Sequence, residues 1–230
     1  MIKVIAFDLD DTLWHIDPVI IRAEKMLKEW FRWKVPGFEY DMETMRPYRE
    51  EVLRDQPSLS RRLTEFRRRV IETALKNHAI VEAETITEEA MEVFLNARNQ
   101  VTFFAGALDT IAGISANYQL GALTNGNADI KRLGLEQYFS FSFSAEEVGA
   151  PKPSPHLFQK ALSHTGVDAG EMVYVGDDRV KDIDAAKAVG LKTIWLRNDR
   201  RAGPAESEPD SIIETIRQLP QAILSIENLV

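Results

Sequence analysis

The chain of 230 residues contains no cysteine and no long apolar stretch. Without thiols it forms no disulfide and uses no thiolate chemistry, which fits a reducing compartment. Its apolar runs fall short of the roughly 18 residues that a membrane span requires. The N-terminal apolar run is too short for a signal peptide and ends in acidic residues. We therefore expect a cytoplasmic protein with no membrane partner.

Basic residues are also outnumbered, with 28 lysines and arginines against 36 acids and a net charge of -8. Because nucleic-acid backbones are bound by clustered lysine and arginine, we expect no nucleic-acid partner. One basic run, residues 46–69, holds eight arginines against four acids. Such a run is typical of a solvated helix face. The alternative is a surface that attracts a small anionic substrate.

The first fourteen residues, MIKVIAFDLDDTLW, join an apolar run to a group of acids. Residues 2–7 predict a buried strand, and Asp8, Asp10 and Asp11 follow it directly. In open α/β sheets, ligands bind outside the carboxyl ends of the strands. Carboxylates held close together repel one another, so this group favours a divalent cation such as Mg²⁺. The alternative is that Asp and Thr merely cap a helix.

The periodicity of the chain changes twice. From 17 to 101, apolar residues recur at intervals of three and four, which predicts a helical insert. Beyond it, short apolar runs alternate with helical patterns, which predicts a parallel sheet with right-handed crossovers. We expect strands at 119–123, 139–143, 172–175 and 192–196, helices at 108–116, 129–133, 155–164, 180–189 and 211–219, and a loop at 197–209. The fold class is α/β, with a Rossmann-like core of residues 1–16 and 102–230 and a helical domain at 17–101.

Polar residues follow the second strand and the next connection. Thr124, Asn125 and Gly126 offer a hydroxyl, an amide and main-chain N–H groups to an anion, although Asn-Gly is also common in turns. Lys152 stands between two prolines, which restrict its backbone. The alternative for Lys152 is an exposed position in a loop.

A further apolar run, residues 172–175, ends at Gly176, Asp177 and Asp178, and Asp182 follows. Asp182 is about one helical turn from Asp178, so these acids also suit a helix N-terminus. In chain order, the strand ends supply acids, an anion-binding hydroxyl, a cation and further acids. A Mg²⁺-dependent phosphoryl-transfer site requires this combination.

The four motifs are Asp8-x-Asp10-x-Thr12, Thr124-Asn125, Lys152 and Gly176-Asp177-x-x-x-x-Asp182. They strongly resemble the phosphatase branches of the haloacid dehalogenase superfamily. The resemblance covers both halves of the core, and the helical insert stands where that superfamily has a helical cap. It implies a phosphatase that acts on a small phosphomonoester.

The resemblance implies a role for each catalytic candidate. Asp8 would attack phosphorus and form an aspartyl-phosphate. Asp10 would protonate the leaving alcohol and then activate water, which requires a pKa raised toward neutrality. Thr124 and Lys152 would bind the phosphoryl oxygens. The expected substrate-binding residues are Thr12, Trp14, Arg46, Asn125 and Gly126.

The same resemblance implies a Mg²⁺ site. Asp8, the main-chain carbonyl of Asp10, and Asp177 would hold the ion. Asp178 or Asp182 would act through water or steady Lys152.

Within the superfamily, residues 7–13, 123–127 and 175–178 look most similar to the flavin mononucleotide phosphatase branch. That branch includes enzymes acting on a phosphorylated ribitylamino-uracil precursor of riboflavin. Residues 57–67, with Thr64 and Arg67, loosely resemble its cap. Trp14, His15, Arg46 and Tyr48 are candidates to contact the leaving group.

We therefore expect flavin mononucleotide or a riboflavin-pathway phosphate as the substrate. The alternatives are a pyrimidine 5'-nucleotidase or sugar-phosphate phosphatase, then a phosphomutase, a 2-haloacid dehalogenase or a non-catalytic binding protein. Dehalogenases lack an acid two residues after the nucleophile and need no metal, so Asp10 and Asp177 favour a phosphatase. A degenerate binding protein would be expected to lose Asp8, Asp10 or Lys152, and all three are present.

Overall fold

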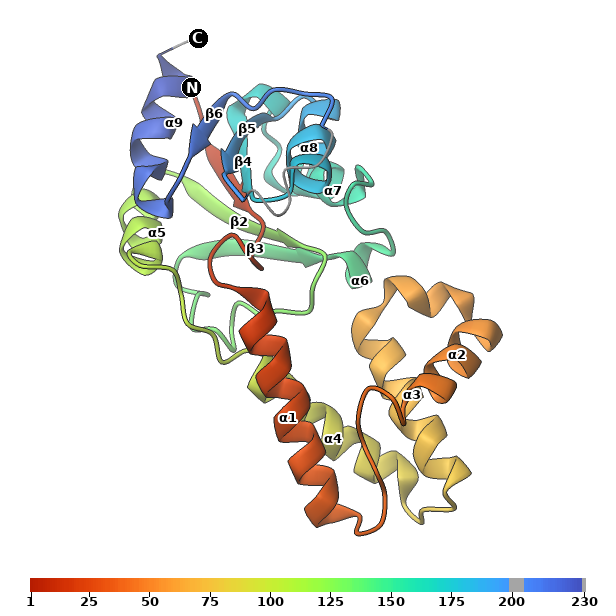
Figure 1. The fold of residues 1–230 in the computed structure, drawn as a ribbon. Helices are drawn as coiled ribbons and strands as arrows, with labels where there is room; N and C mark the ends of the chain where they lie inside the picture. Colours follow the sequence, from red (N-terminus) through yellow and green to blue (C-terminus); the bar gives the residue numbers. More distant parts are fainter. Residues whose placement is uncertain (199–204, 229–230) are drawn as a thin grey trace. The chain divides into compact units, whose positions relative to one another are not determined.

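A computed structural model describes residues 1–198 and 205–228. The chain divides into two compact units. Unit 1 consists of Met1–His15 and Thr102–Val230, and unit 2 of Ile16–Val101. Unit 1 is built of strands and helices, whereas unit 2 is helical (Figure 1). None of the helices in the described part of the chain combines the length and the apolar character needed to cross a bilayer.

Unit 1 contains one six-stranded sheet in the order β3-β2-β1-β4-β5-β6. All neighbouring strands are parallel, which confirms the predicted α/β core. The central strand β1 is buried along its whole length, because parallel neighbours and helices cover it on every side. The strands are β1 Val4–Phe7, β2 Gln119–Thr124, β3 Phe139–Ser144, β4 Met172–Gly176, β5 Lys192–Leu196 and β6 Ser211–Ile213.

Helices cover both faces of the sheet (Figure 1). On one face, α7 and α8 pack on apolar side chains from β1, β2 and β4. On the other face lie α5 and α9. The helices of unit 1 are α5 Ala107–Ser115, α6 Ala145–Val148, α7 His156–Thr165, α8 Ala185–Ala188 and α9 Leu219–Glu227, and a π-helical turn, Arg179–Asp184, precedes α8.

Unit 2 forms around the amphipathic helix α1. This helix buries Val19, Ala23, Leu27 and Phe31, which recur every four residues and so share one face. It packs along α4, and α3 packs against both α4 and α2. The helices are α1 Ile16–Lys34, α2 Arg46–Asp55, α3 Leu63–Asn77 and α4 Ala83–Arg98, with a 3-10 turn at Pro57–Arg61.

Two predicted helices of unit 1 are wrong. Residues 129–133 form turns, because the segment is too short to hold a helix before Gly134, whose φ is +69°. Residues 211–219 begin as strand β6, because Ser211–Ile213 pairs with the edge of β5. A 3-10 turn at Ile216–Gln218 then leads into α9, which starts at Leu219. Part of the predicted loop at 197–209, residues 199–204, lies outside the described residues.

Candidate active site

A tight turn follows β1 and directs its acids to the edge of the sheet. The main-chain N–H of Asp8 donates to Val175 O at 2.9 Å, which fixes Asp8 beside the end of β4. Leu9 O then accepts from the N–H groups of Thr12 at 3.3 Å and Leu13 at 2.8 Å. Asp11 takes the left-handed conformation, with φ of 59°, which Asp tolerates better than most residues. The chain therefore turns back within four residues.

Trp14 lies against Asp10 in the same turn. Its indole N–H donates to Asp10 Oδ1 at 2.9 Å. Trp14 is fully buried, and its ring packs edge-on against Phe103 with centroids 5.6 Å apart. The predicted leaving-group contact is thus a core side chain that orients Asp10. His15 is exposed and packs against Phe104.

Lys152 occupies the centre of a buried cluster. Its ammonium donates to Asp8 Oδ1 at 2.7 Å, to Asp182 Oδ1 at 2.7 Å and to the Tyr174 hydroxyl at 2.6 Å. Only 3% of Lys152 is exposed, so the alternative of an exposed loop lysine is wrong. An ammonium has three N–H donors, and all three are used.

Asn125 holds the main chain of Lys152. Asn125 Oδ1 accepts from Lys152 N at 2.7 Å, and Asn125 Nδ2 donates to Lys152 O at 2.9 Å. The Thr124 hydroxyl accepts from Gly126 N at 2.9 Å. As an acceptor in that bond, the hydroxyl keeps its own hydrogen to donate. The end of β2 thus provides both an anchor for Lys152 and a buried hydroxyl group.

Asp177 is held on each of its oxygens. Its Oδ1 accepts from the Thr12 hydroxyl at 3.4 Å, and its Oδ2 accepts from Asn198 Nδ2 at 2.9 Å. Its main-chain carbonyl accepts from the indole of Trp195 at 2.8 Å. Asp177 is 1% exposed. The structure therefore orients this carboxylate before any ligand arrives.

Asp178 and Asp182 have different surroundings. Asp178 caps the π-helical turn by accepting from Val180 N and Lys181 N. Partial burial acts to raise the pKa of its carboxyl, but the hydrogen bonds from Lys181 and Val180 and the charge of Lys181 outweigh burial and lower the pKa. Asp182 contacts Lys152, and its Oδ2 accepts from Asp178 N at 3.0 Å. Of these two acids, Asp182 is the one that contacts Lys152.

The carboxylates of Asp8, Asp177 and Asp182 converge in the core of unit 1. One oxygen from each lies within 4.8 Å of the others, and all three residues are buried. Burial raises the pKa of Asp8, and the Lys152 ammonium opposes that rise. Three carboxylates thus face one ammonium, and hard oxygen donors with an excess of negative charge suit Mg²⁺. The residues present fit such an ion, and the carbonyl of Asp10 stays a predicted ligand.

Comparison with known proteins identifies the family. A family model described as haloacid dehalogenase-like hydrolase matches residues 2–190. The chain belongs to this family. Over 199 residues the hydrolase is 31% identical to the 5-amino-6-(5-phospho-D-ribitylamino)uracil phosphatase of Escherichia coli (strain K12), covering 85% of this chain and 84% of the relative.

Two further similarities differ in kind. Over 139 residues the hydrolase is 32% identical to the pyrimidine 5'-nucleotidase of the same strain, covering 57% and 62% of the two chains. A crystal structure described as a 2-haloacid dehalogenase from Pseudomonas syringae pv. Tomato DC3000 matches with a TM-score of 0.91 and 38% identity, over 97% of this chain and 99% of that one. The family match and the phosphatase relatives make the chain an enzyme of the phosphatase type, as predicted.

Sequence reasoning missed three residues of this site. Tyr174 was hidden in the apolar run of β4, although a buried phenol needs a hydrogen-bond partner. Trp195 was predicted only as part of the strand at 192–196, with no role in the site. Asn198 follows that strand by two residues, so it could have been recognised as another polar group at a strand end.

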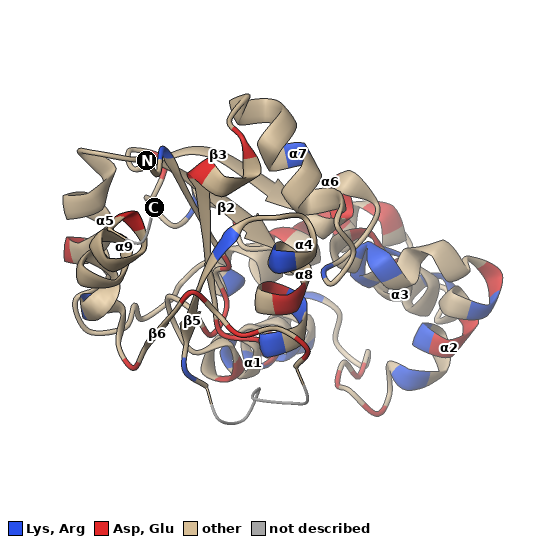
Figure 2. Ribbon diagram, turned by 90° about the horizontal axis from the view of Figure 1, so that it is seen from above, with Lys and Arg blue, Asp and Glu red and all other residues tan. Residues whose placement is uncertain are grey.

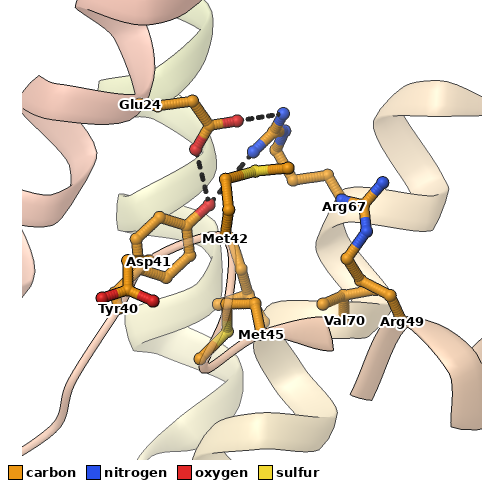
Figure 3. A pocket seen from close by; sticks show the side chains of 9 residues that line it. Glu24, Tyr40, Asp41, Met42, Met45, Arg49, Arg67 and Val70 are labelled. Carbon is orange, nitrogen blue, oxygen red and sulfur yellow. Dashed lines mark hydrogen bonds and ion pairs between the residues drawn. The ribbon is translucent and has the colours of Figure 1, made fainter. Parts of the chain in front are cut away.

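Unit 2 of the hydrolase has a small pocket of its own (Figure 3). Tyr40 donates to Glu24 Oε2 at 3.1 Å and accepts from Arg67 at 3.0 Å, while Arg67 pairs with Glu24 Oε1 at 2.7 Å. The pocket is lined by Glu24, Tyr40, Asp41, Met42, Met45, Arg49, Arg67, Val70 and Ile71.

Two of the predicted leaving-group contacts also belong to unit 2. Arg46 is exposed at the start of α2, and Tyr48 is half-buried.

Several arginines of the basic run of unit 2 are paired with acids. Arg68 pairs with Glu65 and Glu88, and Arg69 pairs with Glu65 and Glu72. Blue and red segments accordingly alternate along α2 and α3 in Figure 2. This supports the interpretation of the run as a solvated helix face.

Proposed function

We propose that this hydrolase cleaves a small phosphomonoester with Mg²⁺, through an aspartyl-phosphate on Asp8. One observation carries the proposal. In unit 1 the buried Lys152 ammonium hydrogen-bonds Asp8 and Asp182 at 2.7 Å, and an oxygen of the buried Asp177 carboxylate lies within 4.8 Å of an oxygen of each of these acids. This arrangement offers a nucleophile, ligands for a divalent cation and a fixed positive charge beside the reacting group.

The reaction divides into two displacements. An oxygen of Asp8 attacks phosphorus, the bond from phosphorus to the ester oxygen breaks, and Asp10 gives its proton to the leaving oxygen. Asp10, now a carboxylate, takes a proton from water, and the water oxygen attacks phosphorus. Inorganic phosphate leaves and Asp8 is regenerated. The hydrogen bond from Trp14 to Asp10 Oδ1 orients the Asp10 carboxyl group for these proton transfers.

The phosphoryl oxygens would be bound by the Thr124 hydroxyl, which accepts from Gly126 N and so keeps its own hydrogen to donate, and by other main-chain N–H groups of the turn after β2. Lys152 would act mainly as a fixed charge, because its three hydrogens already bind protein groups. Asn125 positions Lys152 through two main-chain bonds. Thr12 acts through its hydrogen bond to Asp177.

Asp8 and Asp177, with the main-chain carbonyl of Asp10, would hold Mg²⁺. When bound, the ion supplies positive charge that neutralises the transferring phosphoryl group. Thr12 and Asn198 keep the Asp177 carboxylate oriented for this task. Asp182 stays with Lys152 and prevents the ammonium from being drawn toward the phosphoryl group.

For the substrate, we propose flavin mononucleotide or a riboflavin-pathway phosphate. The E. coli relative, by its name, acts on 5-amino-6-(5-phospho-D-ribitylamino)uracil. Unit 2 would serve as a cap that excludes water and selects the leaving group, with Arg46 as one contact. Pyrimidine nucleotides and sugar phosphates are the alternatives within the same chemistry.

A 2-haloacid dehalogenase is the second candidate, because a structure so described is 38% identical over nearly the whole chain. In that reaction Asp8 would attack carbon and displace a halide. Such a displacement needs neither a proton donor for the leaving group nor a metal. The presence of Asp10 and the orientation of Asp177 therefore favour the phosphatase reaction.

The test is phosphate release from an activated aryl phosphate, with and without Mg²⁺. We expect Mg²⁺-dependent turnover that Asp8→Asn abolishes and that Asp109→Asn, an exposed acid of α5, leaves intact. Release that persists in Asp8→Asn contradicts the proposal. Metal-independent halide release from a 2-haloacid, without phosphate release, would establish the second candidate. A panel of flavin mononucleotide, the ribitylamino-uracil phosphate, pyrimidine nucleotides and sugar phosphates then ranks the substrates.

A further inference from the structure

The side chain of Tyr174 on β4 reaches over the neighbouring strand β1 to β2, because the residues beside it in the sheet are small. In register, Tyr174 of β4 pairs with Ala6 of β1, and Ala6 pairs with Gly121 of β2. Gly121 pairs in turn with Phe141, whose ring lies where a glycine Cβ would be. Because little side chain stands between the two rings, the Tyr174 hydroxyl passes over β1 and donates to Leu123 O at 3.0 Å.

The same hydroxyl accepts from Lys152 Nζ at 2.6 Å. Tyr174 is fully buried, and its ring packs edge-on against Phe158. Because the Tyr174 hydroxyl donates its hydrogen to a main-chain carbonyl, the orientation of the hydroxyl is fixed, and so is the direction in which its oxygen accepts a hydrogen bond. The ammonium is therefore tied, through one hydroxyl, to the strand that ends at Thr124. Leu123, whose carbonyl accepts the hydrogen bond from Tyr174, immediately precedes Thr124.

The three partners of Lys152 differ in what happens to them during the proposed reaction. Asp8 loses its negative charge when it forms a bond to phosphorus, so its bond to the ammonium weakens at that step. Asp182 keeps its charge and pulls the ammonium toward itself. Tyr174 is neutral throughout and opposes movement in either direction.

We propose that Tyr174 is a positioning residue that fixes the Lys152 ammonium beside Asp8, an inference that rests on the proposed function. Tyr174 touches no reacting atom and acts through Lys152. Its hydroxyl keeps the positive charge in place when Asp8 becomes an acyl phosphate, so that the charge remains available to the second displacement. Loss of the hydroxyl should therefore slow turnover more than it weakens substrate binding.

The test compares Tyr174→Phe with a matched control. Tyr118→Phe removes another phenol of unit 1, whose hydroxyl donates to Glu227 at 3.2 Å and lies outside the cluster. With an aryl phosphate, we expect kcat of Tyr174→Phe to fall about tenfold with KM changed less than about twofold, because a hydrogen bond to a charged group is lost. Tyr118→Phe should keep both constants. Wild-type kcat in Tyr174→Phe would overturn the proposal.

A second readout follows the ammonium itself. In ¹⁵N-edited NMR, a buried ammonium with three bonded hydrogens should give a slowly exchanging signal, assigned by its loss in Lys152→Arg. We expect Tyr174→Phe to shift or broaden this signal and Tyr118→Phe to leave it unchanged. If Tyr174 only supports the fold, the melting temperature falls while kcat and the ammonium signal stay at their wild-type values, and the proposal is overturned.

The two readouts separate this proposal from the proposed function. A wild-type chain that releases no phosphate contradicts the function, and the ammonium signal still decides whether Tyr174 positions Lys152. Should Tyr174→Phe not fold, 3-fluorotyrosine at position 174 keeps the ring and the hydroxyl but weakens the oxygen as an acceptor. A shifted ammonium signal then supports the proposal, and an unchanged one overturns it.

Discussion

Each unit of the molecule contains a buried tyrosine whose hydroxyl accepts a hydrogen bond from a basic side chain that is itself paired with an acid. In unit 1, Tyr174 accepts from Lys152, which also binds Asp8 and Asp182. In unit 2, Tyr40 accepts from Arg67 and donates to Glu24 (Figure 3). The same three kinds of side chain are therefore joined in similar ways in two different settings.

The two clusters differ in charge balance. In unit 2 one guanidinium meets one carboxylate at 2.7 Å, and the guanidinium also lies 3.6 Å over the ring of Phe94, so its charge is satisfied. In unit 1 three buried carboxylates lie together, and the one ammonium of the cluster, Lys152, binds two of them. A balanced cluster stabilises a fold, whereas an excess of buried negative charge calls for a further cation. The difference favours a chemical role for the cluster of unit 1 and a structural role for the Tyr40 cluster of unit 2.

The largest effect is expected when the Lys152 ammonium is removed from the buried cluster of unit 1. Lys152→Met leaves Asp8 and Asp182 buried without their partner, so we expect a loss of about 3–5 kcal/mol in the free energy of unfolding. Turnover should also disappear. Urea unfolding of Lys181→Met, which breaks a more exposed pair with Asp178, provides the control and should show a loss of about 0–1 kcal/mol. Equal losses in the two variants would show that burial does not decide the effect.

Displacing Asp182 should disturb the cluster without removing a charge. A Cβ on Gly176 would lie 2.4 Å from Asp182 Oδ2 and 2.5 Å from its Cβ. We expect Gly176→Ala to cost about 1–3 kcal/mol by overpacking and to lower turnover, measured by urea unfolding and phosphate release. Gly170→Ala, where nothing lies within 4 Å, should leave turnover unaffected. Full activity in Gly176→Ala would mean that the place of Asp182 is not critical.

The tyrosine of the balanced cluster should matter only for stability. Tyr40→Phe removes two hydrogen bonds but leaves Glu24 and Arg67 paired, so we expect a loss of about 1 kcal/mol in the free energy of unfolding. The kcat for an aryl phosphate should match wild type, in contrast to Tyr174→Phe. A fall in kcat would break the distinction between the two clusters. Chemical unfolding and steady-state kinetics measured side by side provide the comparison.

The smallest effect concerns an exposed acid of unit 2. The N–H of Thr44 and the Lys28 ammonium hold the pKa of Asp41 at about 2. Because this pKa lies below its unfolded value, Asp41 stabilises the fold above about pH 4, and that contribution is lost as the pH falls toward 2. The stability difference between wild type and Asp41→Asn should therefore shrink over that range. A difference that does not change with pH would contradict this assignment.

Much of unit 1 follows from local sequence signals. Apolar runs that end abruptly in Asp8, Thr124 and Asp177 predict strands whose ends meet at one edge, and the parallel pairing places them there. The buried position of Lys152 is harder to predict from the sequence, because it depends on the two hydrogen bonds from Asn125, which is 27 residues away along the chain. Local patterns identify the elements but not the contacts between their ends.

The role of Tyr174 could not be predicted from its own strand. It depends on Ala6 and Gly121 lying in the same row, which only the register of three strands establishes. The error at residues 211–213 has a similar origin. Two isoleucines in a short polar setting suit a helix as well as a strand, and pairing with the edge of β5 decides between them.

Binding of Mg²⁺ tests the central claim most directly, because it measures the charge imbalance itself. Calorimetric titration of the metal-free chain should show one Mg²⁺ site. Asp177→Asn should weaken this site by at least about tenfold, whereas Glu24→Gln, in the balanced cluster, should leave it unchanged. Wild-type affinity in Asp177→Asn, or a loss of affinity in Glu24→Gln, would contradict the account.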